Sequence, residues 1–322
     1  MDILTLGTRG SQLALFQAHA VAGLLRERDR VECEIVVIKT SGDRLSEASL
    51  AEIGGKRLFV KEIEDALLDG TIDLAVHSSK DMPALLPPGL AIGAVLPRED
   101  ARDAVVLPHG GESLSLEDVV RRLGRAPRIG TSSVRRTAQL TRMFPGARFL
   151  PIRGNLDTRL RKLDAGEFDA IVLAAAGLRR LQHESRISAA LPPDTCVPAP
   201  GQGIIAVEIR SDDERVREQV ARITDPAAAA ALSAERALVT RLGGGCQMPI
   251  GAFASEVGTE LRMIAIVVSV DGSRAARADT RGPIADAEQV GVAAAEQLLA
   301  RGAADILADV EQAQGAVEGI QP

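Results

Sequence analysis

Apolar residues in the first two hundred positions of the chain follow two patterns, short continuous runs and the spacing of one helical face. Short apolar runs at residues 3–6, 32–40 and 72–77 have the length of buried strands. Residues 11–28 and 58–70 instead place apolar side chains on one helical face. Strands that alternate with amphipathic helices are typical of an α/β architecture.

Residues at the expected helix ends support this interpretation. Ser11 stands where a helix N-cap is expected, and Gly70 stands where the second helix ends. Segments 4–14 and 128–138 both place Gly-Thr at the end of a strand and hydroxyl residues at the start of a helix. Backbone N–H groups at helix starts bind carboxylate or phosphate, so both segments are candidate anion sites.

The strand and helix pattern starts again near residue 100. Further strands and helices are predicted at 127–144, 147–154, 155–169 and 170–181. Residues 191–203 are rich in Pro and Gly, which indicates a connection between domains rather than a core element. The run 204–210 that follows is a strand that could return to the first sheet.

The pattern changes after residue 220 to an α+β unit. Helices are predicted at 228–242 and 285–300, a strand is predicted at 261–270, and residues 311–322 are expected to form a loose tail. The expected fold is therefore α/β with three domains, the third smaller and α+β. Their expected ranges are 1–98 with 201–219, then 99–200, then 220–322.

Composition narrows the class of protein. Hydrophobic residues make up 46% of the chain, and no apolar run approaches the length of a membrane helix. The first residues lack the pattern of a signal peptide, so we expect a cytoplasmic protein without a membrane partner. Three widely spaced cysteines favour neither a disulfide framework nor a metal site. A net charge of −6 without Trp or Tyr is atypical of nucleic-acid binding.

Positive charge is concentrated in residues 128–162. This stretch contains eight arginines and Lys162 against a single acid, Asp157. Such a segment attracts anions locally, although the protein as a whole is acidic. A solvated arginine-rich surface is the alternative interpretation.

The segment 77–83, "HSSKDMP", follows a predicted buried strand. Open α/β sheets bind ligands at the carboxyl ends of their strands, so Lys80 and Asp81 are candidate site residues. A carboxylate there could accept hydrogen bonds, stabilise a developing cation or move a proton. The alternative is an aspartate that caps a turn.

Two further segments could carry chemistry. Residues 41–61 form a long polar connection of the kind found in active-site lids, with Lys56 and Phe59 as candidate ligand contacts. Phe59 could instead pack the next helix onto the core. Cys246 lies after three glycines, which leave room for a group bound to its sulfur. Inert packing of a small side chain is the alternative.

Taken together, these segments resemble the porphobilinogen deaminase family. The matching pieces follow the family's order: GTRGSQLA (7–14), GGKRLFVKEIE (54–64), DLAVHSSKDMP (73–83), GTSSVRR (130–136), RGNLDTRLRKL (153–163), PAPGQG (198–203) and GGGCQMPIG (243–251). The resemblance implies two domains similar to periplasmic binding proteins, joined by two crossing segments. It also implies a third domain that carries the cofactor cysteine, here Cys246.

The resemblance implies a transferase of tetrapyrrole biosynthesis. Four porphobilinogen molecules would be joined head to tail into hydroxymethylbilane, with release of ammonia. The covalent cofactor would be a dipyrromethane held by a thioether to Cys246, and no metal is implied. The resemblance further implies a monomer whose partner is the small-molecule substrate.

The match to the family's motifs implies that residues in and near segments 4–14 and 128–138 would bind the carboxylates of the pyrrole rings. Asp81 would hold pyrrole N–H groups and stabilise the positive charge that forms when ammonia leaves. The residues expected to bind the cofactor are Cys246, Lys80, Ser78, Thr131, Ser132, Ser133, Arg135, Arg136, Arg153 and Gly154. The residues expected to bind substrate are Arg9, Ser11, Phe59, Arg153 and Arg159, with Lys56 in the lid.

A carboxylate-binding protein with two clamping domains and no chemistry is the rival hypothesis. The cationic stretch 128–162 would suit such a protein. The glycine-flanked Cys246 in a third unit favours the enzyme instead. A covalently bound pyrrole would distinguish the two, since a simple binder has no reason to carry one.

Overall fold

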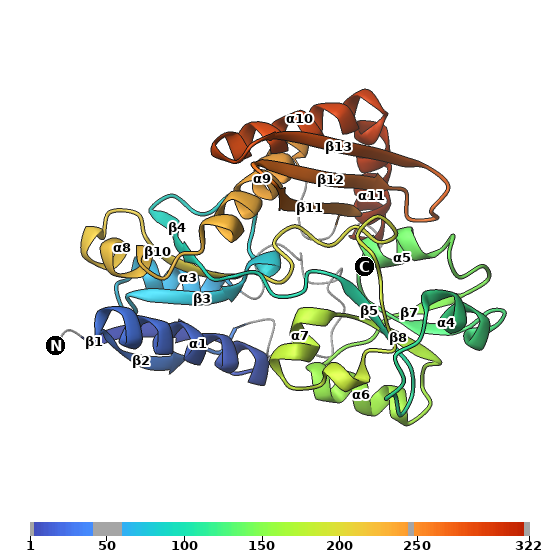
Figure 1. Cartoon of the computed structure of the whole chain (residues 1–322), viewed down its shortest axis with the longest axis horizontal. Coiled ribbons are helices and arrows are strands. Elements are labelled where there is room, and N and C mark those ends of the chain that lie inside the picture. Colours follow the sequence, from blue (N-terminus) through green and yellow to red (C-terminus); the bar gives the residue numbers. More distant parts are fainter. Residues whose placement is uncertain (1–2, 41–59, 244–247, 319–322) are drawn as a thin grey trace.

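Three β-sheets organise the residues that the computed structural model describes, which are 3–40, 60–243 and 248–318. In Figure 1 the third sheet lies above the other two, with the first at lower left and the second at lower right. The first two sheets have helices on both faces, whereas the third is antiparallel. The expected α/β fold with a smaller α+β part near the C-terminus is confirmed.

The first sheet has the strand order β2-β1-β3-β10-β4. Its strands are β1 (Ile3–Thr8), β2 (Glu32–Val37), β3 (Leu74–Ser78), β4 (Leu90–Val95) and β10 (Ile205–Arg210). Helices α1 (Gln12–Asp29) and α8 (Glu214–Ala221) pack on one face, and α3 (Lys61–Leu68) packs on the other. Strand β10 runs antiparallel between β3 and β4, which confirms that residues 204–210 return to this sheet.

The second sheet repeats this plan with the order β7-β6-β8-β5-β9. Its strands are β5 (Asp103–Val106), β6 (Arg128–Gly130), β7 (Arg148–Leu150), β8 (Ala170–Ala174) and β9 (Ala189–Ala190). Its helical segments are α4 (Leu116–Leu123), α5 (Val134–Leu140), α6 (Leu156–Asp164), α7 (Ala175–Arg180) and the 3-10 turn η2 (Glu184–Arg186). Strands β6, β7 and β8 are parallel, so their carboxyl ends meet at one edge.

The third sheet is a meander of β11 (Ile250–Val257), β12 (Glu260–Val268) and β13 (Ala275–Pro283). The elements that flank it are α9 (Pro226–Leu242), η3 (Ile284–Asp286), α10 (Ala287–Ala300) and α11 (Ala303–Glu318). The loose tail expected from residue 311 is wrong as far as residue 318, because α11 continues through it. Ile306, Leu307 and Val310 pack into the core, which anchors this helix.

The connection 191–203 forms neither a helix nor a strand, but the expectation that it lies outside the core is wrong. Cys196, Val197 and Gln202 are almost completely buried. Val197 packs with residues of α5 and β12 in one apolar cluster. The segment is buried because it passes between the second and third sheets. No helix of the described ranges is long and apolar enough to cross a membrane.

Candidate functional site

A short 3-10 turn, η1 (Ser79–Asp81), follows strand β3 directly and presents Asp81. The Ser79 amide donates to the carbonyl of Ile204, and the Met82 amide donates to that of Ser79. Asp81 itself is exposed, and no described residue donates a hydrogen bond to its carboxylate. The turn is therefore held by its backbone, and it presents an exposed Asp81 side chain.

Ser78 and Ser11 both have partners within the first sheet and its helices. The Gln17 amide nitrogen lies 2.8 Å from the Ser78 hydroxyl, so helix α1 supports the end of β3. Ser11 is the N-cap of α1, with its hydroxyl accepting from the Ala14 amide at 3.3 Å, as the sequence predicts. Gln17 is nearly fully buried, and its supporting role was not predicted from the sequence.

Lys80 has an unusual environment for a lysine. Burial of the ammonium lowers its pKa from 10.5 to about 8, although the neighbouring Asp81 carboxylate opposes this shift. Its Nζ lies 3.5 Å from Gln202 Oε1. Gln202 comes from the buried connection, so this contact joins the η1 turn to the segment that leads into β10.

Thr131, Ser132 and Ser133 form the turn between β6 and α5. The Ser133 amide donates to Thr131 Oγ1, and the Ser133 hydroxyl caps α5 by accepting from the Arg136 amide. The Ser132 hydroxyl is bonded to both the amide and the carbonyl of Ile152. It therefore ties this turn to the loop before α6.

That loop carries Arg153 and Gly154, and α6 carries Arg159. Gly154 has φ of +103°, and an added Cβ would lie 2.7 Å from a methyl carbon of Thr158. The Gly154 carbonyl accepts a hydrogen bond from Arg159 Nε at 2.8 Å. Burial lowers the pKa of Arg159 to about 10, and the charges of Arg136 and Arg153 lower it further, whereas the Asp81 carboxylate opposes this shift. Asp81 of the first sheet and the arginines of the second thus lie within electrostatic reach of one another.

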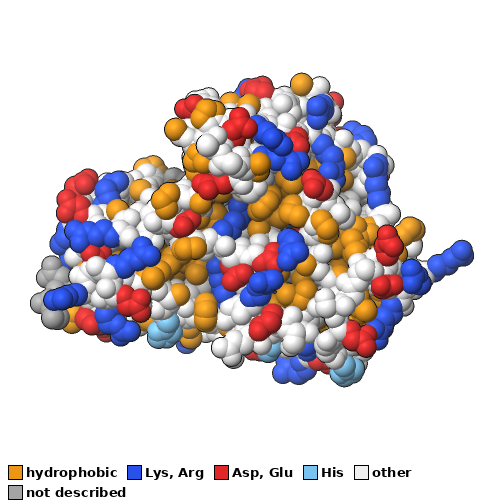
Figure 2. Space-filling view, viewed as in Figure 1, with side chains coloured by type: hydrophobic (Ala, Val, Ile, Leu, Met, Phe, Trp, Pro, Cys, Tyr) orange, Lys and Arg blue, Asp and Glu red, His pale blue; other side chains and the backbone are white. Residues whose placement is uncertain are grey.

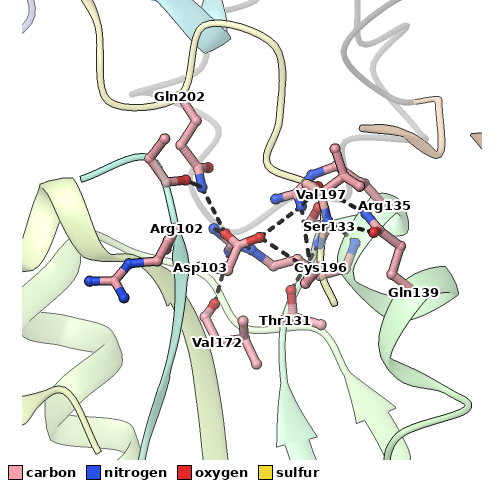
Figure 3. A network of polar contacts seen from close by, with 12 residues as sticks. Arg102, Asp103, Thr131, Ser133, Arg135, Gln139, Val172, Cys196, Val197 and Gln202 are labelled. Carbon is pink, nitrogen blue, oxygen red and sulfur yellow. Dashed lines mark hydrogen bonds and ion pairs between the residues drawn. The ribbon is translucent and has the colours of Figure 1, made fainter. Parts of the chain in front are cut away.

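Arg135 and Arg136 are more deeply buried than their predicted role suggests. Both guanidinium groups bind the carboxylate of Asp103, at 2.7 Å for Arg135 and 2.8 Å for Arg136. Figure 3 shows Asp103 at the centre of this network, with Gln202 above and Cys196 and Val197 beside it. Asp103 was not among the residues predicted from the sequence, although an acid at the start of a wholly apolar strand signals a buried cationic partner.

A cavity of about 90 Å³ is lined by residues from the parts around all three sheets. Figure 2 shows apolar side chains gathered where the part around the third sheet meets the parts below it. Among the described residues that line it, three are cations and none is an acid. The lining residues are Ser79, Lys80, Met82, Ala84, Ser133, Arg135, Ala199, Pro200, Leu232, Arg236, Val239, Met248 and Ile250.

This lining suits a group that combines aromatic rings with carboxylates. Lys80, Arg135 and Arg236 supply positive charge, while Leu232 and Ile250 supply apolar contact. Met248 lines the cavity and follows Cys246 by two residues in the chain.

Of the remaining predicted site residues, only Arg9 lies within the described ranges. Arg9 is half-buried at the end of β1, immediately before α1. Cys246, Lys56 and Phe59 lie outside the described residues, as does most of the predicted lid 41–61. Within the described ranges, no group of three acidic, histidine or cysteine side chains could hold a metal ion.

Comparison with known proteins identifies the class to which this fold and site belong. A sequence profile described as "Porphobilinogen deaminase, dipyromethane cofactor binding domain" matches residues 4–218. A second profile, "Porphobilinogen deaminase, C-terminal domain", matches residues 229–300. The chain belongs to the porphobilinogen deaminase family, as the resemblance predicts.

Curated relatives match over almost their whole length. The porphobilinogen deaminase of Geotalea daltonii is 46% identical over 310 residues, which are 96% of this chain and 95% of the relative. That of Geobacter metallireducens is 46% identical over 316 residues, which are 98% of this chain and 97% of the relative.

Among solved structures, the similarities are distant. The periplasmic VFT2 domain of Bordetella pertussis BvgS has a TM-score of 0.38 and 17% identity, and the match covers 69% of this chain and 86% of that domain. An ancestral arginine-binding protein bound to arginine has a TM-score of 0.37 and 14% identity, with coverage of 69% and 91%.

Proposed function

We propose that this protein is a hydroxymethylbilane synthase. It joins four porphobilinogen molecules head to tail into a linear tetrapyrrole, with release of four ammonia molecules. The observation that carries this proposal is 46% identity to porphobilinogen deaminases over nearly the full length of both chains. The match of residues 4–218 to a dipyrromethane-binding domain supports the proposed cofactor.

We assign the three proposed domains the ranges 1–98 with 201–219, 99–200 and 220–322. The membership of the sheets supports this division, since β10 pairs with β3 and β4 although β5 to β9 intervene in the chain. The connections near residues 98 and 200 are then the two crossing segments.

The dipyrromethane is proposed to be joined to Cys246 through a thioether and to lie along the cationic cavity. When bound, it supplies the free pyrrole carbon to which the first substrate is joined. Lys80 and Arg135 would neutralise its carboxylates, since both line the cavity. The other proposed contacts are Ser78, Thr131, Ser132, Ser133, Arg136, Arg153 and Gly154.

Asp81 is the proposed catalytic residue. Loss of ammonia from porphobilinogen leaves positive charge on the substrate's pyrrole ring, and a nearby carboxylate stabilises this charge. The same carboxylate can accept the proton that a pyrrole carbon loses when the new bond forms. The exposure of Asp81 and its lack of a donor among the described residues support this role.

Substrate carboxylates are proposed to bind Arg9, Ser11, Arg153 and Arg159. Each porphobilinogen carries two carboxylates, and a planar guanidinium grips a carboxylate with two parallel hydrogen bonds. The electrostatic coupling of Arg159 to Asp81 supports a substrate position between them. Phe59 and Lys56 are proposed to contact substrate from the lid.

We further propose that the protein acts as a monomer in the cytoplasm. The described cysteines Cys33 and Cys196 are free thiols, the form that a reducing compartment maintains. Sedimentation of the purified protein at the mass of two chains would contradict the monomer.

The mass of the purified protein tests the function directly. We expect the intact chain to be heavier than its sequence by two deaminated porphobilinogen units, and we expect this mass to map to the peptide that contains Cys246. Fully active protein without added mass would overturn the proposal. Unmodified protein that binds porphobilinogen without turnover would favour the carboxylate-binding alternative.

Substitution of the catalytic carboxylate tests the mechanism. Asp81→Asn should keep the fold and lower kcat by about 10²- to 10⁴-fold, because the amide can neither stabilise the cation nor accept a proton. Asp69→Asn, at the exposed end of α3, is the matched control and should keep normal turnover. A normal rate for Asp81→Asn would remove Asp81 from the mechanism.

A further inference from the structure

Asp103 is a fully buried carboxylate whose two oxygens are both saturated by donors. Oδ1 accepts from Arg136 Nε at 2.9 Å and from the Gln202 side-chain amide at 2.9 Å. Oδ2 accepts from Arg135 Nη1 at 2.7 Å, and Cys196 Sγ lies 3.5 Å from it. These donors come from α5 and from the buried connection 191–203, so Asp103 joins two separate segments.

The charges in this cluster do not cancel. One carboxylate faces two guanidinium groups, and Arg135 and Arg136 are only 5% and 7% exposed. The two guanidiniums hold the pKa of Asp103 well below its usual range, so the carboxylate stays ionised. The cluster therefore keeps one net positive charge inside the protein.

The two guanidiniums are held differently. Arg136 is fixed by Asp103 and by the carbonyl of Val172, to which its Nη1 donates at 2.9 Å. Arg135 binds Asp103 and the carbonyl of Val197 through the same nitrogen, Nη1. Arg135 also lines the cationic cavity, and the hydrogen bonds that it makes to described residues all come from Nη1.

Gln202 extends this restraint to Lys80. Its amide nitrogen donates to both Asp103 and the carbonyl of Ala101, at 2.9 and 2.7 Å. These two acceptors orient the amide so that its oxygen faces Lys80 Nζ. A single carboxylate thus sets the positions of two arginines and, through Gln202, of the lysine beside Asp81.

We propose that Asp103 is a positioning residue for the carboxylate-binding side of the site. It holds Arg135 and Arg136 in place, leaves one positive charge for a ligand carboxylate, and directs Gln202 toward Lys80. This inference rests on the proposed function, because the ligand carboxylates are those of pyrrole rings.

The central test is Asp103→Glu, which keeps the charge but moves the carboxylate by one methylene group. We expect the KM for porphobilinogen to rise about 10- to 100-fold, because displaced guanidiniums bind carboxylates poorly, with a smaller change in kcat. We also expect purified protein to carry the two-pyrrole mass on a clearly smaller fraction of chains, as measured by intact mass. Asp169→Glu is the matched control, since Asp169 pairs with Arg128 at the surface of the same sheet.

Loss of folding is separated from loss of positioning by two further variants. Asp103→Asn leaves two buried cations without a carboxylate and should melt at a lower temperature. Adding Arg136→Gln removes one of these cations, and we expect the double variant to regain thermal stability without regaining normal KM or loading. Recovery of both stability and KM in the double variant would show that the role of Asp103 is only structural.

The outcomes distinguish this inference from the function on which it rests. If the unmutated protein carries no pyrrole mass, the proposed function and the inference both fail. If the unmutated protein is loaded and Asp103→Glu shows the same loading and the same KM, the inference alone fails. A lower melting temperature of Asp103→Glu with unchanged KM and loading leads to the same rejection.

Discussion

Lys80 shows how burial changes the chemistry of a single side chain. Its folded pKa of about 8 lies below the ordinary 10.5, and burial is the main cause. Between these two values the unfolded chain binds more protons than the folded one, so this residue makes stability rise with pH in that range. The ammonium needed to bind a carboxylate is, by contrast, present below about pH 8 and lost above it.

We therefore expect kcat/KM to fall at high pH as the Lys80 ammonium loses its proton. We expect kcat/KM of the unmutated enzyme to decline at or above pH 8. The decline can lie above pH 8 because a carboxylate of the proposed dipyrromethane, bound before substrate arrives, stabilises the Lys80 ammonium. In Lys80→Arg the side chain stays charged, so this decline should vanish. The measurement is kcat/KM of both proteins from about pH 7 to pH 9.5.

Lys80→Gln completes the comparison. Its kcat/KM should already be low at pH 7 and should lack the decline at or above pH 8 that we assign to Lys80. Any titration of the substrate itself affects all three proteins alike and cancels in their ratios. A parallel decline in the unmutated enzyme and in Lys80→Arg would assign the titration to another group.

At the scale of elements, the buried connection 191–203 controls the η1 turn by direct contact. Gly201 has φ of +72°, and an added Cβ would lie 2.6 Å from the Ser79 hydroxyl and 3.1 Å from the Lys80 amide nitrogen. The connection approaches the turn this closely because residue 201 has no side chain. The positions of Lys80 and Asp81 thus depend on a glycine more than a hundred residues away.

Gly201→Ala should destabilise the protein through both backbone strain and this clash. Gly70 has the same φ of +72°, but an added Cβ there would meet nothing within 4 Å. Gly70→Ala therefore measures the strain alone, about 1–2 kcal/mol. We expect Gly201→Ala to cost about 1–3 kcal/mol more in the free energy of unfolding, measured by urea denaturation.

Activity provides a second comparison between these variants. Gly201→Ala should also lower kcat, because the clash displaces the turn that carries Asp81, whereas Gly70→Ala should not. Equal stability and equal kcat in the two variants would mean that the connection does not position the turn.

At the scale of the whole molecule, Glu235 joins the part around the third sheet to both connections that run between the first two sheets. Its carboxylate is fully buried on α9 and binds both terminal nitrogens of Arg98, at 2.6 and 3.1 Å. It also accepts from the amides of Gly201 and Ala254, at 2.6 and 2.8 Å. Arg98 in turn lies over the ring of Phe253, with 4.9 Å to the ring centre.

Glu235→Gln is expected to lower the free energy of unfolding by about 3–5 kcal/mol. The substitution leaves the buried guanidinium of Arg98 without a counter-charge. It also turns an amide N–H toward backbone N–H groups that need an acceptor. Chemical denaturation of the two proteins measures this difference.

Glu296 provides the control for this prediction. It pairs with Arg241 at the surface, where both side chains are about half exposed. Glu296→Gln should change the free energy of unfolding by less than about 1 kcal/mol, because water screens the pair. Similar losses in both variants would argue against Glu235 as a link between the third sheet and these connections.

The local pattern of the sequence determined much of this protein. The cap at Ser11, the helix α1 behind it and the strands β1, β2 and β3 follow from residues that lie within a few positions of one another. The strand at 204–210 was predicted in the same way, with a return to the first sheet as a possibility that the structure confirms. The motifs also sufficed to predict the family, which the comparisons confirm. The roles of Asp81 and Cys246 stay predictions.

Only the tertiary structure decided which charges meet and which segments become interior. Asp103 pairs with Arg135 across 32 positions and with Gln202 across 99, and no local period records such distances. The same holds for the burial of the connection 191–203, whose Pro and Gly residues predict a connection but not what surrounds it. Partners of buried charges are chosen by the packing of whole sheets, because only packing removes the water that would otherwise solvate them.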